Sequence, residues 1–133
     1  MKKYFAVLLA AFISGSPLLA YAMSDYSSDG NFNLSGDLKD GVREIQVEAF
    51  RYGYKPDPIV VNEGEKVRLI ATSSDVTHGL QIKEFGVNAT LAAGEKKSVE
   101  FIADKAGVFT IHCSVYCGPG HAAMTGKLIV RKK

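Results

Sequence analysis

The sequence has no large excess of charge of either sign, is too short for a second domain and contains only two cysteines. At 133 residues it allows one domain with a full hydrophobic core and is too short for two domains of ordinary size. The formal net charge is only +2, and it vanishes if a leader carrying the first two lysines is removed. General polyanion binders carry a basic excess, so nucleic acid is not an expected partner.

The first 22 residues have the features of a secretory signal peptide. Two lysines precede an apolar run over 4–13, and the sequence A-Y-A at 20–22 offers a cleavage site between small residues. We therefore predict an exported, periplasmic protein. The stretch over 4–23 is also nearly long enough to span a bilayer, so an uncleaved segment would leave the protein membrane-anchored. No cysteine lies near the cleavage site, and a lipid-modified N-terminus is not indicated.

Composition divides the remaining chain into two parts. Residues 24–41, SDYSSDGNFNLSGDLKDG, are dominated by Ser, Asp, Gly and Asn. A segment of this kind cannot bury enough apolar surface to order itself. We expect a flexible tether over 23–41 and a folded domain over 42–133.

After residue 41 the sequence changes to short runs in which apolar residues alternate with polar ones. Turn residues separate most of these runs, and no convincing 3.6-residue periodicity is present, which argues against a helical fold. Seven or eight short strands of this kind predict an all-β fold, an antiparallel β-sandwich. The alternating sets are Ile45/Val47/Ala49, Ile59/Val61, Val67/Leu69/Ala71, Leu80/Ile82, Val99/Phe101 and Leu128/Val130, and Val108/Thr110/His112 alternate with Phe109/Ile111/Cys113.

One C-terminal run, CSVYCGPGHAAM, contains Cys113, Cys117, His121 and Met124. The glycines and the proline in its middle allow the backbone a tight path around a small object. His78, far upstream in THGLQI, could meet this run if both lie at the same end of the sandwich, where loops cluster. The alternative is that the two cysteines of an exported protein form only a structural disulfide.

The types of donor narrow the choice of metal. Structural zinc takes four Cys or His ligands, which leaves Met124 unexplained. A mononuclear copper site uses two His, one Cys and a weak axial Met, which leaves one cysteine unexplained. A site with two copper ions bridged by two thiolates would use all of these donors.

The pattern C-S-x-x-C-G-x-x-H-x-x-M closely resembles the binuclear copper A (CuA) loop of cytochrome c oxidase subunit II. The stretches YGYKPDPIVVNEGEKV and SSDVTHGLQI are also similar to that subunit, particularly to the form in bacterial B-type haem-copper oxidases. The resemblance runs from about Val47 to Lys132, which is nearly all of the expected domain. It implies a cupredoxin-like Greek-key sandwich.

The resemblance also implies a role for each donor of a centre with two copper ions. Cys113 and Cys117 would bridge both ions, while His78 would bind one ion and His121 the other. Met124 would be the weak axial ligand of one ion. The backbone carbonyl of Val115 would be the weak ligand of the other.

The function that the resemblance implies is electron transfer, with no catalysis by the chain alone. Electrons would come from a c-type cytochrome or another small redox protein and pass to a terminal oxidase, whose catalytic subunit is a further expected partner. Two departures stand out: Val115 replaces a glutamate that helps many family members to hold a further metal ion, and the tryptophan that admits electrons in mitochondrial-type members is absent. The alternatives are a copper carrier or assembly factor for an oxidase and a subunit of nitrous oxide reductase type.

Overall fold

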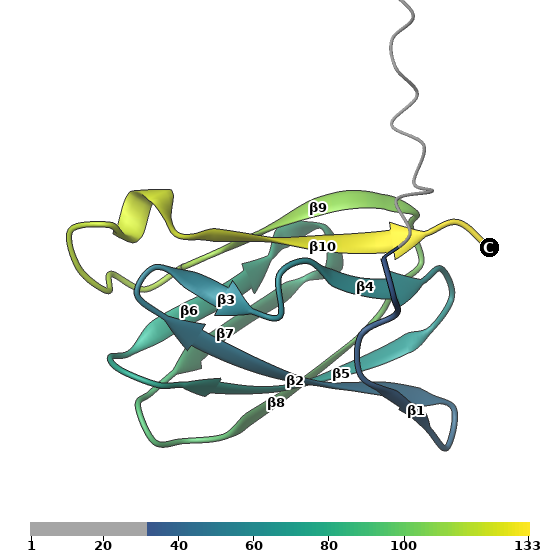
Figure 1. Cartoon of the computed structure of the whole chain (residues 1–133), viewed down its shortest axis with the longest axis horizontal. Helices are drawn as coiled ribbons and strands as arrows, with labels where there is room; N and C mark the ends of the chain where they lie inside the picture. Colours follow the sequence, from purple (N-terminus) through teal and green to yellow (C-terminus); the bar gives the residue numbers. More distant parts are fainter. Residues whose placement is uncertain (1–31) are drawn as a thin grey trace, which may run out of the picture.

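The structure is a computed structural model that describes residues 32–133, and its strands form two five-stranded sheets (Figure 1). The first sheet has the order β1-β2-β5-β8, with β3 also paired to β2. The second has the order β4-β10-β9-β6-β7. The strands of the first sheet are β1 (Asp37–Lys39), β2 (Val42–Phe50), β3 (Gly53–Lys55), β5 (Lys66–Ser73) and β8 (Lys97–Ile102). Those of the second are β4 (Ile59–Asn62), β6 (His78–Ile82), β7 (Val87–Leu91), β9 (Gly107–His112) and β10 (Thr125–Arg131).

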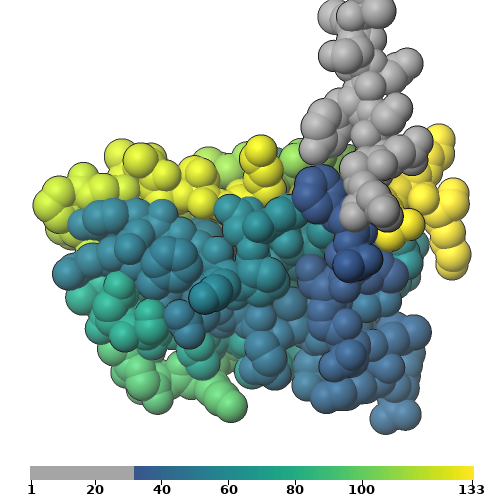
Figure 2. Space-filling view, in the orientation of Figure 1, coloured from purple at the N-terminus to yellow at the C-terminus, as the bar shows by residue number. Residues whose placement is uncertain are grey.

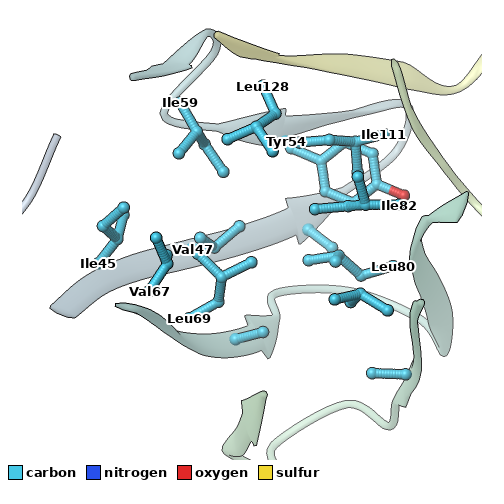
Figure 3. Packing of buried hydrophobic residues seen from close by; sticks show 14 of the residues in the cluster. Ile45, Val47, Tyr54, Ile59, Val67, Leu69, Leu80, Ile82, Ile111 and Leu128 are labelled. Atoms are coloured by element: carbon cyan, nitrogen blue, oxygen red, sulfur yellow. The ribbon is translucent and has the colours of Figure 1, made fainter. Parts of the chain in front are cut away.

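The core lies between the two sheets and follows the predicted alternation. Along β2, Ile45, Val47 and Ala49 are buried, while Gln46 and Glu48 between them are exposed. Side chains of both sheets point toward one another in the close-up of the core (Figure 3). Burying one face of each strand in this way fixes the register of the sheets, since a slip by one residue would turn every apolar side chain outward.

The expected all-β sandwich is confirmed, but it has ten strands rather than seven or eight, and two pairings are not antiparallel. β2 runs parallel to β5, and β4 runs parallel to β10. The alternation of apolar residues reports which face of a strand is buried, and it says nothing about the direction of the neighbouring strand. Two of the strands, β1 and β3, have only three residues, too few to show a period.

A strand, β1, lies before residue 42, inside the segment expected to be a tether. β1 forms a hairpin with β2, and the turn between them uses Asp40 and Gly41 with φ of 48° and 78°. Ser35 adds two hydrogen bonds to Val60, one from its backbone N–H and one to its side-chain oxygen. A polar segment can therefore join a sheet through hydrogen bonds, without burying its own side chains. The predicted signal peptide over 1–22 and the start of the tether lie outside the described residues.

Strand directions bring three remote parts of the chain to one end of the sandwich. β9 is antiparallel to both β6 and β10, and its last residue, His112, pairs with Thr125 at the start of β10 and with Gln81 near the end of β6. The residues that follow β9 therefore run past the start of β6, where the N–H of Gly79 donates to the sulfur of Cys113. The loop between β9 and β10, which includes the short 3-10 helix η2 (His121–Ala123), forms this end, and the C-terminus lies at the other (Figures 1 and 2). A second 3-10 helix, η1 (Lys83–Phe85), joins β6 to β7. Within residues 32–133, no helix is both long and apolar enough to cross a membrane.

Candidate metal centre

The two cysteines lie where β9 ends. Cys113 directly follows the last residue of β9, and Cys117 comes four residues later in the loop. Both side chains are buried and neither forms a disulfide. Their sulfur atoms are 3.5 Å apart. One loop therefore directs two soft donors into the same small volume.

Each sulfur has an imidazole of its own beside it. The Sγ atom of Cys113 is 3.9 Å from Nδ1 of His78, and that of Cys117 is 3.7 Å from Nδ1 of His121. The donor atoms of His78 and the two cysteines all lie within 4.8 Å of one another. The two histidines thus belong to opposite halves of the site.

A weaker donor also lies beside each sulfur. The thioether sulfur of Met124 is 3.6 Å from Sγ of Cys117, and the carbonyl oxygen of Val115 is 3.0 Å from Sγ of Cys113. The structure therefore brings together all six residues that the sequence predicts as metal ligands. Their role as ligands stays a prediction.

Backbone hydrogen bonds shape the ligand loop. Gly118 adopts a φ of 137°, which a residue with a side chain rarely takes, and η2 begins after Gly120. The N–H of Met124 donates to the carbonyl of His121 at 3.1 Å, and the N–H of Cys113 donates to the carbonyl of Met124 at 3.4 Å. These bonds close the loop back onto the end of β9, so the donors come from a constrained backbone.

His78 is fully buried, and the far side of its ring contacts a carboxylate. Its Nε2 lies 2.6 Å from Oδ1 of Asp75, which leaves Nδ1 facing the sulfur of Cys113. A carboxylate in this position fixes the orientation of the imidazole and makes it a better donor. Partial burial works against ionisation of Asp75, but hydrogen bonds from the N–H groups of Val76 and Arg51 and from His78 bring the pKa of this carboxyl below its ordinary value.

The buried thiol of Cys117 holds its proton strongly when no ion is near. Burial is the main cause that raises the pKa of Cys117 to about 11, and the neighbouring Cys113 adds to it. A thiol of this kind becomes a thiolate when a metal ion displaces its proton, so uptake of metal would release protons.

A close approach of two backbones at Gly79 completes the site. A Cβ atom at this position would lie 2.5 Å from the backbone nitrogen of Ser114 and 2.1 Å from its Oγ. The N–H of Gly79 donates to Sγ of Cys113 at 3.5 Å, and its carbonyl accepts a 2.6 Å hydrogen bond from the buried hydroxyl of Tyr54. The segment that carries His78 is therefore in direct contact with the loop that carries both cysteines.

The donors fit copper well. Two thiols, two imidazoles, a thioether and a carbonyl form a soft set of the type that copper takes in electron-transfer sites. Two thiolates would offset much of the charge of the ions, which a site this buried requires. A closed tetrahedral zinc site would leave the buried thioether of Met124 without a use.

Sequence reasoning missed three residues that support the donors, namely Arg51, Tyr54 and Asp75. Asp75 could have been found, since a carboxylate three residues before a suspected ligand suggests a partner for its ring. Arg51 and Tyr54 carry no such signal, because their contacts depend on how the first sheet packs against the loop.

Comparisons with known proteins find similarity to oxidase subunits and to nitrous-oxide reductases. The family model described as the periplasmic domain of cytochrome c oxidase subunit II matches residues 20–131. Cytochrome c oxidase subunit 2 of Thermus thermophilus is 35% identical over 88 residues, which cover 66% of this chain and 65% of that protein. The nitrous-oxide reductase of Cupriavidus necator is 38% identical over 120 residues, which cover 86% of this chain and 19% of the reductase. The chain spans less than two thirds of the length of each of these relatives.

A solved structure agrees with the sequence comparisons. A chain of a haem-copper terminal oxidase dimer is 28% identical, with a TM-score of 0.65 over 75% of this chain and 72% of that chain. The fold of this chain is therefore similar to that of a chain in an oxidase complex.

Proposed function

The chain belongs to the family of the cytochrome c oxidase subunit II periplasmic domain, and from this membership we propose that it holds a binuclear copper centre that passes single electrons to a terminal oxidase. The observation that carries the proposal is the pair of sulfurs 3.5 Å apart, each with a different imidazole beside it. A mononuclear copper site takes two imidazoles and one thiolate, so the second thiol would not be a ligand. Cys113 and Cys117 would bridge the ions, with His78, His121, Met124 and the carbonyl of Val115 as terminal ligands.

A copper pair of this type supplies a site where one electron is shared by two ions. The protein contributes rigidity, since the donors lie on a loop closed by backbone hydrogen bonds and on the start of a buried strand. A frame that holds the ligands in one geometry lowers the structural change on gain or loss of an electron. A small change in ligand geometry on reduction favours fast electron transfer at a low driving force.

The surface around His121 suits brief contact with a redox partner. This imidazole is half-buried, and its neighbours in the loop are the small residues Gly120, Ala122 and Ala123. The aromatic ring of Tyr116 lies 5.6 Å from it, centroid to centroid, and is 73% exposed. We propose a c-type cytochrome or another small redox protein as the electron donor, docking here in the periplasm, and the oxidase catalytic subunit as the electron acceptor.

Copper reconstitution tests the proposal directly. The full chain with both thiols reduced should take up two copper ions. Removal of one electron from the pair of copper(I) ions by an added oxidant such as ferricyanide should turn the protein purple and give an EPR pattern from one unpaired electron shared by two copper nuclei. A single ion per chain with a blue type 1 spectrum would contradict it.

A copper carrier or assembly factor, the alternative from the sequence, is not favoured. Carriers present exposed methionines or histidines for handover, whereas His78 and Met124 are almost completely buried. Rapid loss of copper to a weak chelator would be the result expected of a carrier.

A further inference from the structure

We propose that Arg51 is a positioning residue that joins the two ligand-bearing halves of the copper centre and places a positive charge beside them. The inference rests on the proposed function and extends it to a residue that is not itself a ligand. Arg51 lies in the turn between β2 and β3, in a sheet that supplies no ligand.

Two contacts of Arg51 reach the two halves of the site. Its backbone N–H donates a 2.7 Å hydrogen bond to Oδ2 of Asp75, whose other oxygen lies 2.6 Å from the ring of His78. Its guanidinium Nε donates a 3.1 Å hydrogen bond to the carbonyl oxygen of Cys117. One residue therefore contacts the partner of one imidazole and the backbone of the cysteine beside the other.

The next residue of the same turn adds a second contact to the ligand loop. The ring of Tyr52 lies so close to the backbone of the loop that a Cβ at Gly120 would be 2.5 Å from it, and a Cβ at Gly118 would be 2.6 Å from its hydroxyl. The turn thus supports the loop through a hydrogen bond at Cys117 and through ring packing against the glycines that follow. In the space-filling view, the blue region that includes β3 lies directly against the yellow-green ligand loop at this end (Figure 2).

The charge of Arg51 has a consequence that a neutral donor would not have. Its guanidinium is hydrogen-bonded to the residue that carries one of the two sulfurs, while the carboxylate of Asp75 lies on the side of His78. A positive charge held close to a redox centre favours the form that carries the extra electron. The side chain of Arg51 therefore raises the reduction potential, whereas its backbone N–H serves only to hold Asp75.

Three substitutions separate the charge of the Arg51 side chain from its hydrogen bond to Cys117 in the copper-loaded full chain. R51Q keeps a hydrogen-bond donor and removes the charge, R51K keeps the charge, and R51A removes both. Arg68→Ala is the matched control, because Arg68 is an arginine of the same sheet engaged in ion pairs with Glu44 and Glu100. The measurements are the midpoint potential, the EPR spectrum and the competition for copper(I) with a chelator of known affinity.

We expect R51A to hold copper(I) about 10-fold more weakly, which is the lower end of the usual effect of losing a supporting contact of a metal site. R51A and R51Q should both have a lower midpoint potential than the wild type, and R51K should restore it. Arg68→Ala should change neither quantity.

The proposal is overturned if R51A has wild-type potential, EPR spectrum and copper affinity while its melting temperature falls, because Arg51 would then be only structural. If the wild type itself takes up no copper, the proposed function fails first and this inference fails with it. The two failures are distinguished by the wild-type measurement alone.

Discussion

At the scale of single residues, the two imidazoles of the site differ in their surroundings. His78 is fully buried and its ring is fixed by Asp75, whereas His121 is half-buried next to the exposed ring of Tyr116. The first is suited to hold the centre in place. The second is the proposed ligand through which a partner at the surface would exchange electrons.

The cysteines provide the sharpest test at this scale. Cys117→Ser should abolish the EPR signature of a shared electron and leave the sandwich folded, because a donor is lost while the side chain at this buried position changes little in size. EPR of the copper-loaded variant and its far-ultraviolet circular dichroism measure the two effects separately. Unfolding of the variant would mean that the cysteine pair is mainly structural.

The ligand loop could be predicted from the sequence almost completely, since its donors lie within 12 residues and their types restrict the chemistry. His78 was also predictable from the sequence, because it lies in the stretch SSDVTHGLQI, which resembles the family. Arg51 was not, because the approach of the turn between β2 and β3 to Cys117 is a property of cross-sheet packing.

At the scale of elements, the contact of β6 with the ligand loop depends on a missing side chain. Gly79→Ala would place a methyl group 2.5 Å from a backbone nitrogen, so the loop must move. We expect at least about 10-fold weaker copper binding, although Gly79 is no ligand, and a loss of about 1–3 kcal/mol of unfolding free energy from overpacking.

Gly64→Ala is the control for this variant. Gly64 has a φ of 86°, and a Cβ added there would meet no neighbouring atom of residues 32–133 within 4 Å, so alanine strains the backbone without overpacking. Its turn lies beside Arg131, at the end of β10 remote from the ligand loop. Copper titration and chemical unfolding of both variants check the prediction. Equal copper affinity in Gly79→Ala and the wild type would contradict the close packing of β6 on the loop.

The outer face of the first sheet carries an ion network that crosses β1, β2, β5 and β8. Lys39 and Arg68 contact Glu44, and Arg68 and Lys66 contact Glu100. The hydrogen bond from Lys39 is the main cause that lowers the pKa of Glu44 from its ordinary value of 4.5, and Arg68 adds to it.

This network predicts a small loss of stability in acid. Because the pKa of Glu44 is lower in the folded protein than in the unfolded chain, its contribution is present above about pH 4.5 and is lost as the pH falls through the folded-state value. Glu44→Gln should therefore flatten the fall in the urea midpoint below pH 5, and high salt should weaken the effect. Glu48→Gln, on the same strand but outside the network, should behave as the wild type.

The strands themselves could be predicted wherever apolar residues alternate over five or more positions, as in β2 and β5. β1 was missed because its three residues are all exposed and are held by pairing with β2 rather than by burial. The parallel pairing of β4 with β10 could not be predicted from the sequence either, because it joins segments almost 70 residues apart.

At the scale of the whole molecule, copper should act as a cross-link of the folded state. The donors come from the start of β6, the end of β9 and the approach to β10, and an unfolded chain does not bring these together. A ligand at about 1,000 times its dissociation constant stabilises a protein by about 4 kcal/mol. For a domain of this size, the melting temperature should rise by on the order of 15 °C.

Calorimetry of the reduced protein with and without copper(I) measures this shift. Cys117→Ser should show much less of it. A melting temperature that does not respond to copper in the wild type would mean that the donors are not assembled around an ion.

The last strand leads away from the ligand loop. β10 begins directly after Met124 and runs for seven residues to Arg131, a distance of about 20 Å. A tag placed after Lys133 would therefore attach the protein to an electrode by the end remote from its sulfur donors, with His121 turned toward the solution. Such a film should exchange electrons readily with dissolved partners and only slowly with the gold beneath it.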